Sequence, residues 1–432
     1  MIDKFRTVLA SKLPPGSFIR NVVTLMTGTT FAQALMILVA PILTRLYSPE
    51  DFGIYALYTS ILGIIAVVSC WRYELAIVLP EKDEDAANLL VLSICICFGM
   101  AVLTLILVAL FRNPLASLFG VPKLAPWLWF MPLSLIATGL FQAFNYWSTR
   151  RRQFRRLAIR QITQSTITAA TQLGAGVTMN PGPAGLISGS IIGQTVATLR
   201  LAYATFKEES STIRQSSLNS IKREARKYRK FPQYSLPTGL LNTASQQMPG
   251  ILIPLFFSAT VLGHYYLAQR VFSAPMGVIG QAYTQAVYPR MAECFNSGND
   301  LRAYVRQMYG QLFKIVVLPA IVLTIFAPSL FAFIFGEPWR VSGIYLRYLI
   351  PWLTIMFIIS PSTNVFSILN KQEFVLTYEV ALFLARLGAF IIGGLLLKNF
   401  YYTVAIFGLI GLLANIYLYF KIDSLLKGVA HS

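Results

Sequence analysis

The strongest constraint on the fold of this chain is a series of apolar stretches of about 20 residues or more, the length at which a helix crosses a bilayer. Twelve of them follow one another along the 432 residues. They lie at 19–45, 52–79, 86–111, 124–147, 157–178, 184–205, 232–257, 259–288, 309–335, 341–369, 374–397 and 400–420. Only 12% of the residues are charged, about half the share in a typical soluble domain. We therefore predict an all-α integral membrane protein with about 12 transmembrane helices. A soluble multidomain enzyme, a disordered scaffold and a secreted disulfide module are excluded.

The surplus of positive charge predicts the orientation. The chain has 36 Lys and Arg residues against 17 Asp and Glu, a net charge of +19. In a soluble domain this surplus would suggest nucleic acid, but cytoplasmic loops of membrane proteins retain Lys and Arg. With the N-terminus in the cytoplasm, the inside segments hold 25 of these residues and the outside segments five. We expect both termini in the cytoplasm, contact between the basic loops and membrane lipid, and no nucleic-acid partner.

Internal similarity suggests two equivalent halves. The longest polar connection, Phe206–Arg229, lies between the sixth and seventh spans. Gly53–Leu57 (GIYAL) opens the second span, and Gly263–Leu267 (GHYYL) opens the eighth. Likewise, Phe119–Pro122 (FGVP) precedes the fourth span and Phe335–Pro338 (FGEP) precedes the tenth. Gly28 in the first span corresponds to Gly239 in the seventh. Each of these three similarities is weak alone, but they recur at a nearly constant offset.

We therefore predict two pseudo-symmetric six-helix lobes related by an axis along the membrane normal. The N-terminal lobe would span 1–206, a basic cytoplasmic linker 207–230, and the C-terminal lobe 231–432. Two such lobes imply a cleft on the axis that opens alternately to either side. This is the architecture of a transporter.

Ionisable residues inside the apolar spans are costly and therefore mark candidate functional groups. They are Arg72, Glu74, Arg270, Arg347, Glu379 and Arg386, with Arg45 at the outer end of the first span. On a continuous helix Arg72 and Glu74 would lie about 200° apart, so we do not expect them to pair. The excess of guanidinium groups predicts an anionic substrate, with phosphate favoured because Arg grips it in a bidentate manner.

Polar residues share a helix face with Arg270. At about 100° per residue, Gln281 falls within about 40° of Arg270 and Gln285 lies about 60° away. We interpret this face as the wall of a wet cavity. Gln164 and Gln172 form a second polar stripe in the fifth span. For that stripe two interpretations stay open, a cavity wall or hydrogen bonds between packed helices.

Several motifs resemble bacterial polysaccharide-biosynthesis membrane proteins, the Wzx-type oligosaccharide flippases of the MOP exporter superfamily, which also includes the MATE drug exporters. The motifs are TRLYSPEDFG at 44–53, RYELA at 72–76, FPQYSLP at 231–237, YLAQRV at 266–271 and YPR at 288–290. The resemblance implies translocation of an undecaprenyl-diphosphate-linked oligosaccharide across the bacterial inner membrane by alternating access. The product would enter O-antigen, capsule or exopolysaccharide assembly.

The resemblance also implies roles for particular residues. Arg72 and Arg270 match the family's intramembrane arginines, and Arg45 matches the arginine that ends its first helix. Arg347 and Arg386 are placed in the substrate cavity on the physical argument alone. A polysaccharide polymerase and a chain-length regulator are the expected protein partners of a monomeric transporter.

The sequence also bears on the energy source and on competing functions. The phosphate-binding pattern G-x-x-x-x-G-K-[ST] does not occur, so we expect no ATP-binding loop, and we expect no metal, cofactor or enzymatic activity. Glu74, Glu379 and Glu293 are the candidates for coupling to H⁺ or Na⁺. One alternative is a MATE-like antiporter, which would favour an acidic cavity. Another is a membrane-embedded polysaccharide polymerase or ligase, which would present a large outside loop.

Overall fold

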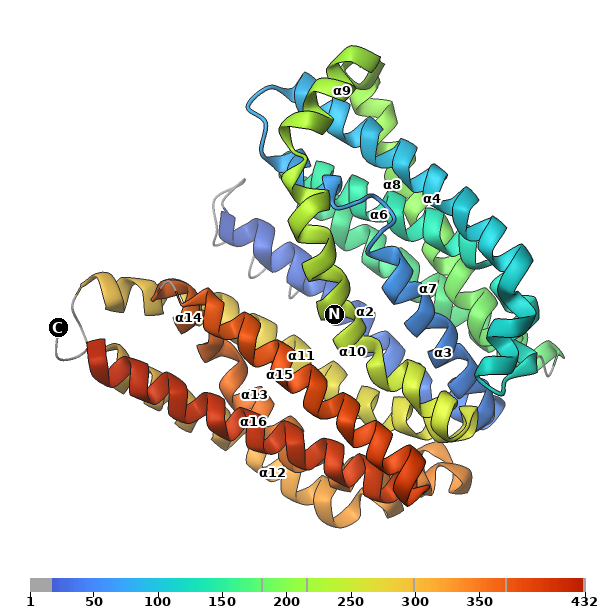
Figure 1. Ribbon diagram of the computed structural model, residues 1–432, viewed down its shortest axis with the longest axis vertical. Coiled ribbons are helices and arrows are strands. Elements are labelled where there is room, and N and C mark those ends of the chain that lie inside the picture. Colours follow the sequence, from blue (N-terminus) through green and yellow to red (C-terminus); the bar gives the residue numbers. More distant parts are fainter. Residues whose placement is uncertain (1–17, 180–181, 215–216, 298–299, 370, 430–432) are drawn as a thin grey trace. The chain divides into compact units, whose positions relative to one another are not determined.

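The computed structural model describes residues 18–179, 182–214, 217–297, 300–369 and 371–429 (Figure 1). These residues form helices joined by short connections, and no strand occurs among them. Within the described ranges, twelve helices have 18 or more residues, and each overlaps one of the twelve predicted stretches. The all-α prediction with about twelve long helices is therefore confirmed.

The long helices of the first half are α2 (Phe18–Leu46), α3 (Pro49–Ala66), α4 (Asp83–Leu118), α6 (Met131–Arg150), α7 (Phe154–Met179) and α8 (Pro183–Arg214). Those of the second half are α10 (Leu236–Phe256), α11 (Ala259–Asn296), α12 (Leu301–Phe335), α13 (Arg340–Ile359), α15 (Gln372–Ile391) and α16 (Phe400–Val429). By length and apolar composition alone, six described helices could cross a membrane, or seven if α5 (Ala125–Leu128) and α6 form one bent span.

The chain forms two compact units. The first contains Met1–Val39, described from residue 18, and Leu57–Gln247. The second contains Ala40–Ala56 and Met248–Ser432. The predicted division into lobes at 1–206 and 231–432 stays a prediction.

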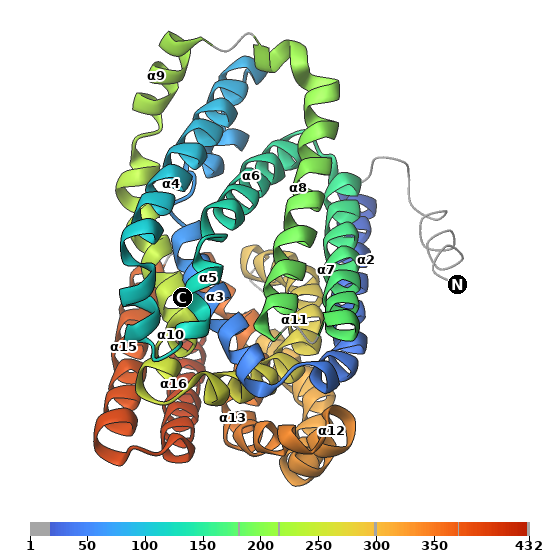
Figure 2. The same cartoon turned by 90° about the vertical axis from the view of Figure 1, so that its right-hand side faces the viewer.

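In the first unit, α7 packs along α8, and α6 packs between α4 and α8 (Figure 2). Glycines permit the close approach of α7 and α8, since a Cβ added at Gly193 would lie 2.1 Å from Oγ1 of Thr168. A buried apolar cluster includes Ile77, Leu90, Phe144 and Trp147, which come from three different elements. Because Ile77 belongs to the short helix η1 (Tyr73–Val78), this cluster fixes η1 against α4 and α6.

The predicted second span is not one helix. α3 ends at Ala66, and Trp71 and Arg72 have left-handed backbones with φ of 51° and 64° before η1 begins. Such a conformation is uncommon for residues other than glycine. The expectation of a continuous helix through Arg72 and Glu74 is therefore wrong.

In the second unit, α13 packs against α11, α12 and α16, and α15 packs on α16 (Figure 1). The start of α3 meets the start of α11 in a reciprocal contact. A Cβ on Gly53 would lie 1.7 Å from the Ala259 carbonyl oxygen, and one on Gly263 would lie 1.8 Å from that of Pro49. The two glycines that the sequence repeat pairs thus meet at one helix crossing.

The other repeated motif has the same local structure in both halves. Gly120 and Gly336 have positive φ values of 61° and 104°. Each glycine lies just before a short 3₁₀ helix, η2 (Pro122–Leu124) in one half and η4 (Glu337–Trp339) in the other. The repeat inferred from sequence is therefore visible in the backbone.

Candidate functional site

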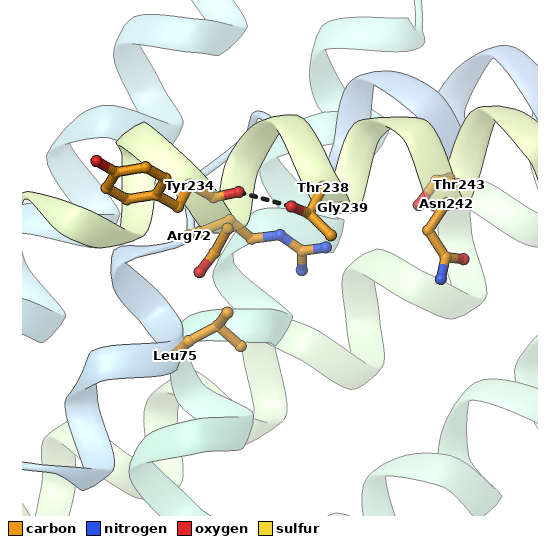
Figure 3. Close-up of a pocket in the computed structure, with 8 residues that line it drawn as sticks. Arg72, Leu75, Tyr234, Thr238, Gly239, Asn242 and Thr243 are labelled. Atoms are coloured by element: carbon orange, nitrogen blue, oxygen red, sulfur yellow. Dashed lines mark hydrogen bonds between the residues drawn. The ribbon is translucent and has the colours of Figure 1, made fainter. Parts of the chain in front are cut away.

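The first candidate site is a cavity of about 490 Å³ in the first unit, beside Arg72. It is lined by Arg72 and Leu75 near η1 and by a run of mostly polar residues at and just before the start of α10. Thr238, Gly239, Asn242 and Thr243 belong to α10, and Tyr234 and Ser235 belong to the short helix η3 (Phe231–Ser235) just before it. Figure 3 shows Arg72 lying along α10, with Asn242 farther along that helix. The cavity therefore combines one guanidinium group with hydroxyl and amide groups.

The guanidinium of Arg72 packs directly against Gly239 of α10. A Cβ added at Gly239 would lie 2.1 Å from Nη2 of Arg72, so a larger residue there would displace the guanidinium. The left-handed backbone at Arg72 turns the chain so that the side chain reaches α10. Arg72 itself is partly exposed, at 23% of its side chain, and can therefore be reached from the cavity.

Glu74 is the nearest acidic group to Arg72. Its Oε1 lies 3.9 Å from Nη1 of Arg72, and its side chain is 1% exposed. The expectation that the two residues do not pair is therefore wrong, because the break after α3 replaces the helix on which it rested. At 3.9 Å the contact is an ion pair but too long for a hydrogen bond. In the described part of the chain, neither Glu74 oxygen nor Nε of Arg72 has a hydrogen-bond partner. Because Nε is itself buried, a ligand in the cavity would reach the terminal Nη atoms of the partly exposed side chain.

Sequence reasoning missed the polar wall contributed by α10. Thr238 donates to the carbonyl oxygen of Tyr234 at 2.8 Å, and Asn242 accepts from Gln246 at 2.6 Å. Thr238, Asn242 and Gln246 recur every four residues, which places them on one helix face. That spacing is the signal from which this wall could have been predicted.

The second candidate site surrounds Arg270 in the second unit. Arg270, on α11, donates from Nη1 to Oη of Tyr266 at 3.2 Å, and its guanidinium lies 5.8 Å from the centre of that ring. Tyr55 of α3 packs edge-on against Tyr266, with ring centroids 6.1 Å apart. Within the described ranges, no carboxylate lies within 4 Å of Arg270. Aromatic groups, and not an acid, therefore hold this cation.

Arg386 has a different aromatic setting in the same unit. Its guanidinium lies 4.7 Å from the ring of Trp352 and 5.1 Å from that of Phe407, and its buried Nε has no hydrogen-bond partner among the described residues. Glu379, seven residues earlier on α15, is exposed. No ion pair joins the two in the part of the chain that is described.

The other predicted charged residues lie at exposed positions. Arg45 is exposed near the end of α2, and Glu293 is exposed near the end of α11. Arg347 is also exposed and donates from Nη2 to the carbonyl oxygen of Ile325 on α12. None of these three residues lines the cavity beside Arg72, and their predicted roles stay predictions.

The predicted glutamines fall into two groups. Gln164 donates to Oε1 of Gln194 at 2.6 Å, and Gln172 donates to the Leu186 carbonyl at 2.9 Å, so both bridge α7 and α8. This geometry favours helix packing over a cavity wall for that stripe. The side chains of Gln281 and Gln285 lie outside the described residues.

Sequence reasoning also missed a buried cation inside the predicted span 157–178. Arg160 lies in α7, is 5% exposed, and stacks over Phe141 at 3.4 Å from the ring centre. The count of charged residues alone could not distinguish it from the neighbouring loop arginines.

Solved transporter structures share the fold, among them a lipid II flippase and a MATE family transporter. This chain matches the lipid II flippase MurJ in an inward closed conformation, with a TM-score of 0.73 and 13% identity. The match covers 94% of this chain and 90% of the MurJ chain. This chain also matches an inward-facing multidrug resistance MATE family transporter of the MOP superfamily, with a TM-score of 0.70 and 15% identity over 93% of this chain and 96% of that one. At these identities the matches establish the fold alone, and they confirm the predicted MATE-like class of multi-pass membrane protein.

Sequence comparison identifies the family. The chain is 22% identical over 339 residues to the succinoglycan biosynthesis transport protein ExoT of Rhizobium meliloti (strain 1021). The match covers 74% of this chain and 63% of that protein, so the chain spans less than two thirds of the relative's length. Residues 42–343, more than half of the chain, match the family model described as polysaccharide biosynthesis protein. The chain belongs to the polysaccharide biosynthesis protein family.

Proposed function

We propose that this protein is a flippase of the bacterial inner membrane. It moves undecaprenyl-diphosphate-linked oligosaccharides from the cytoplasmic to the periplasmic leaflet by alternating access. Membership of the polysaccharide biosynthesis protein family and the fold shared with a lipid II flippase support this proposal. The protein needs no catalytic group for this step, because translocation makes and breaks no covalent bond.

The observation that carries the proposal is the state of Arg72 and Arg270. Both guanidinium groups belong to stretches that the sequence predicts to span the membrane, and neither donates a hydrogen bond to a carboxylate in the described residues. A diphosphate is a polyanion with planar faces of acceptor oxygens, which Arg binds with two parallel hydrogen bonds. In a medium of low dielectric constant, an arginine without a bonded acid attracts such a group strongly.

Other features fit the remaining parts of the substrate. Thr238 and Asn242 in the Arg72 cavity offer hydroxyl and amide groups for sugars. The polyprenyl chain needs no polar partner and remains in lipid. Glu74, buried 3.9 Å from Arg72, is the coupling residue that this geometry supports. A proton on Glu74 would weaken its attraction for Arg72 and free the guanidinium for phosphate.

A flipping assay tests the proposal. The purified protein is placed in liposomes with a polyprenyl-diphosphate disaccharide that carries a fluorophore on the sugar, and a membrane-impermeant reductant bleaches the outer leaflet. We expect the wild type to expose the inner pool, and Arg72→Ala and Arg270→Ala to abolish this. Arg340→Ala, which removes an exposed arginine paired with Glu337, is the matched control. The proposal would be contradicted if vesicles with the wild-type protein showed the same extent of bleaching as protein-free vesicles. It would also be contradicted if the protein transported an organic cation in place of the lipid.

A further inference from the structure

A second cavity lies along α11 beyond Arg270, which does not itself line it. It measures about 360 Å³ and lies between α11 and α13 in the second unit. Ser273, in its wall, is three residues after Arg270, which places it about 4.5 Å farther along the α11 axis. Gly277, also in the wall, is seven residues after Arg270, about 10.5 Å along that axis. The cavity therefore begins one helical turn from the arginine and continues along the same helix.

The walls combine aromatic rings with hydroxyl groups and carry no charge. Phe272 and Phe357 supply rings, and Ser273, Thr284 and Ser360 supply hydroxyls. None of these three hydroxyls makes a hydrogen bond to another described residue. A ring of Phe packs against the C–H face of a sugar, and free hydroxyls bond with sugar hydroxyls. Small-molecule sites usually pair an apolar wall with a few such polar groups, in volumes of about 300–1,000 Å³.

The glycines on α11 leave space for a ligand. A Cβ added at Gly277 would meet no heavy atom within 4 Å. At Gly280 the nearest atom would be a ring carbon of Phe357, at 3.7 Å, which is ordinary packing. The space beside Gly277 is therefore open, and Phe357 closes its α13 side.

The absence of charge selects among possible occupants. A phosphate or a uronic acid would lose its water without gaining a charged partner from the described lining residues, which is unfavourable. A lipid chain would leave the three wall hydroxyls without partners. A neutral sugar satisfies both the rings and the hydroxyls.

We propose that this cavity binds the neutral sugar attached directly to the diphosphate, while the diphosphate lies on Arg270. The inference rests on the proposed function, which supplies the diphosphate. It adds the substrate class at this position, a neutral pyranose in place of an acidic sugar. It also gives the cavity a role in selecting which lipid-linked unit is accepted.

A comparison of three probes tests the inference. The affinity of the purified protein is measured for a polyprenyl diphosphate, for the same lipid carrying one glucose, and for the same lipid carrying one glucuronic acid. For the wild type we expect the glucose probe to bind about tenfold more tightly than the sugarless lipid, the gain from one or two added hydrogen bonds and ring packing. The glucuronic acid probe should gain nothing.

Gly277→Leu places an apolar side chain into this space, where its Cβ meets no heavy atom within 4 Å, and leucine is a better helix former than glycine. We expect this variant to bind the glucose probe no better than the sugarless lipid. Gly99→Leu is the matched control, because Gly99 is exposed on α4 and its Cβ would also meet nothing within 4 Å. It should retain the tenfold preference.

The outcomes separate this inference from the proposed function. If the wild type binds glucose and sugarless lipids equally, the sugar site is wrong while diphosphate recognition stands. If Gly277→Leu weakens the binding of all three probes equally, the cavity holds the lipid chain and the inference is overturned. If the wild type binds none of the three lipids, both proposals fail.

Discussion

Arg72 and Arg270 both belong to stretches that the sequence predicts to span the membrane, but the protein holds their guanidinium groups in different ways. Arg72 follows a helix break, has a left-handed backbone and lies 3.9 Å from the buried carboxylate of Glu74. Arg270 lies within the continuous helix α11, and its described hydrogen-bond partner is Tyr266. The first cation is partly neutralised by an acid, whereas the second is held by aromatic groups that leave its charge intact.

This difference predicts unequal contributions to anion binding. An arriving phosphate at Arg72 competes with Glu74, and part of the interaction energy is spent on separating the pair. At Arg270 no acid competes among the described residues. Arg270 should therefore dominate affinity, while Arg72 should couple affinity to the protonation of Glu74.

The largest expected effect is that of Arg270→Ala. We expect polyprenyl diphosphate binding to weaken about 100-fold, because hydrogen bonds to charged groups contribute about 1.5–3 kcal/mol each. Arg270→Lys should recover part of this loss, since a lysine keeps the charge but not the bidentate geometry. Titration of the lipid into each purified variant measures both affinities. An affinity within twofold of wild type for Arg270→Ala would remove this residue from the site.

Arg72→Ala should have a smaller effect on binding, about tenfold, together with a loss of stability. The variant leaves Glu74 buried without its cation, which lowers the free energy of unfolding by about 1–3 kcal/mol. The double variant Arg72→Ala/Glu74→Gln should regain the stability but not the affinity. Thermal unfolding in detergent measures the stability of each variant, and titration with the lipid measures its affinity. If the double variant also regained affinity, Arg72 would not contact the ligand.

Gly239→Ala tests the placement of Arg72 without removing its charge. The added methyl group displaces the guanidinium from α10, and we expect binding to weaken about fivefold, the equivalent of about 1 kcal/mol. Gly99→Ala, a glycine with free space around it, is the control for the change in helix propensity. Unchanged binding in Gly239→Ala would show that Arg72 acts from another position.

Tyr73→Phe should have the smallest effect. Oη of Tyr73 donates to the Ala225 carbonyl of α9 (Leu218–Lys227) at 3.1 Å, and this bond ties η1 to the basic linker helix. Its loss should lower the free energy of unfolding by about 1 kcal/mol and leave affinity for the lipid unchanged. A binding loss as large as that of Arg72→Ala would mean that α9 positions the arginine.

Much of the fold could be predicted because the apolar stretches are long and the charged residues few. All twelve long helices overlap the stretches seen in the sequence. The break between Ala66 and Tyr73 could not be predicted, because neither glycine nor proline marks it and the segment reads as a continuation of an apolar helix. The left-handed backbone there is maintained by packing against distant helices, which local propensity does not report.

The candidate site was predicted less completely, for the same reason. Intramembrane charge identified Arg72, Arg270 and Glu74, since each is costly in an apolar span. Periodicity did not distinguish a cavity wall from a helix contact, and Gln172 lies at a contact with α8. The polar face of α10 at Thr238 and Asn242 had a readable spacing, but its position beside Arg72 depends on tertiary packing.

The most direct test of the central claim, that guanidinium groups recognise a lipid diphosphate, compares two lipids that differ by one phosphate. The affinities of the purified protein for a polyprenyl diphosphate and for the matching polyprenyl monophosphate are measured at constant ionic strength. We predict that the wild type prefers the diphosphate at least about tenfold, and that Arg72→Ala/Arg270→Ala binds the two equally. Equal binding of both lipids by the wild type would contradict the account.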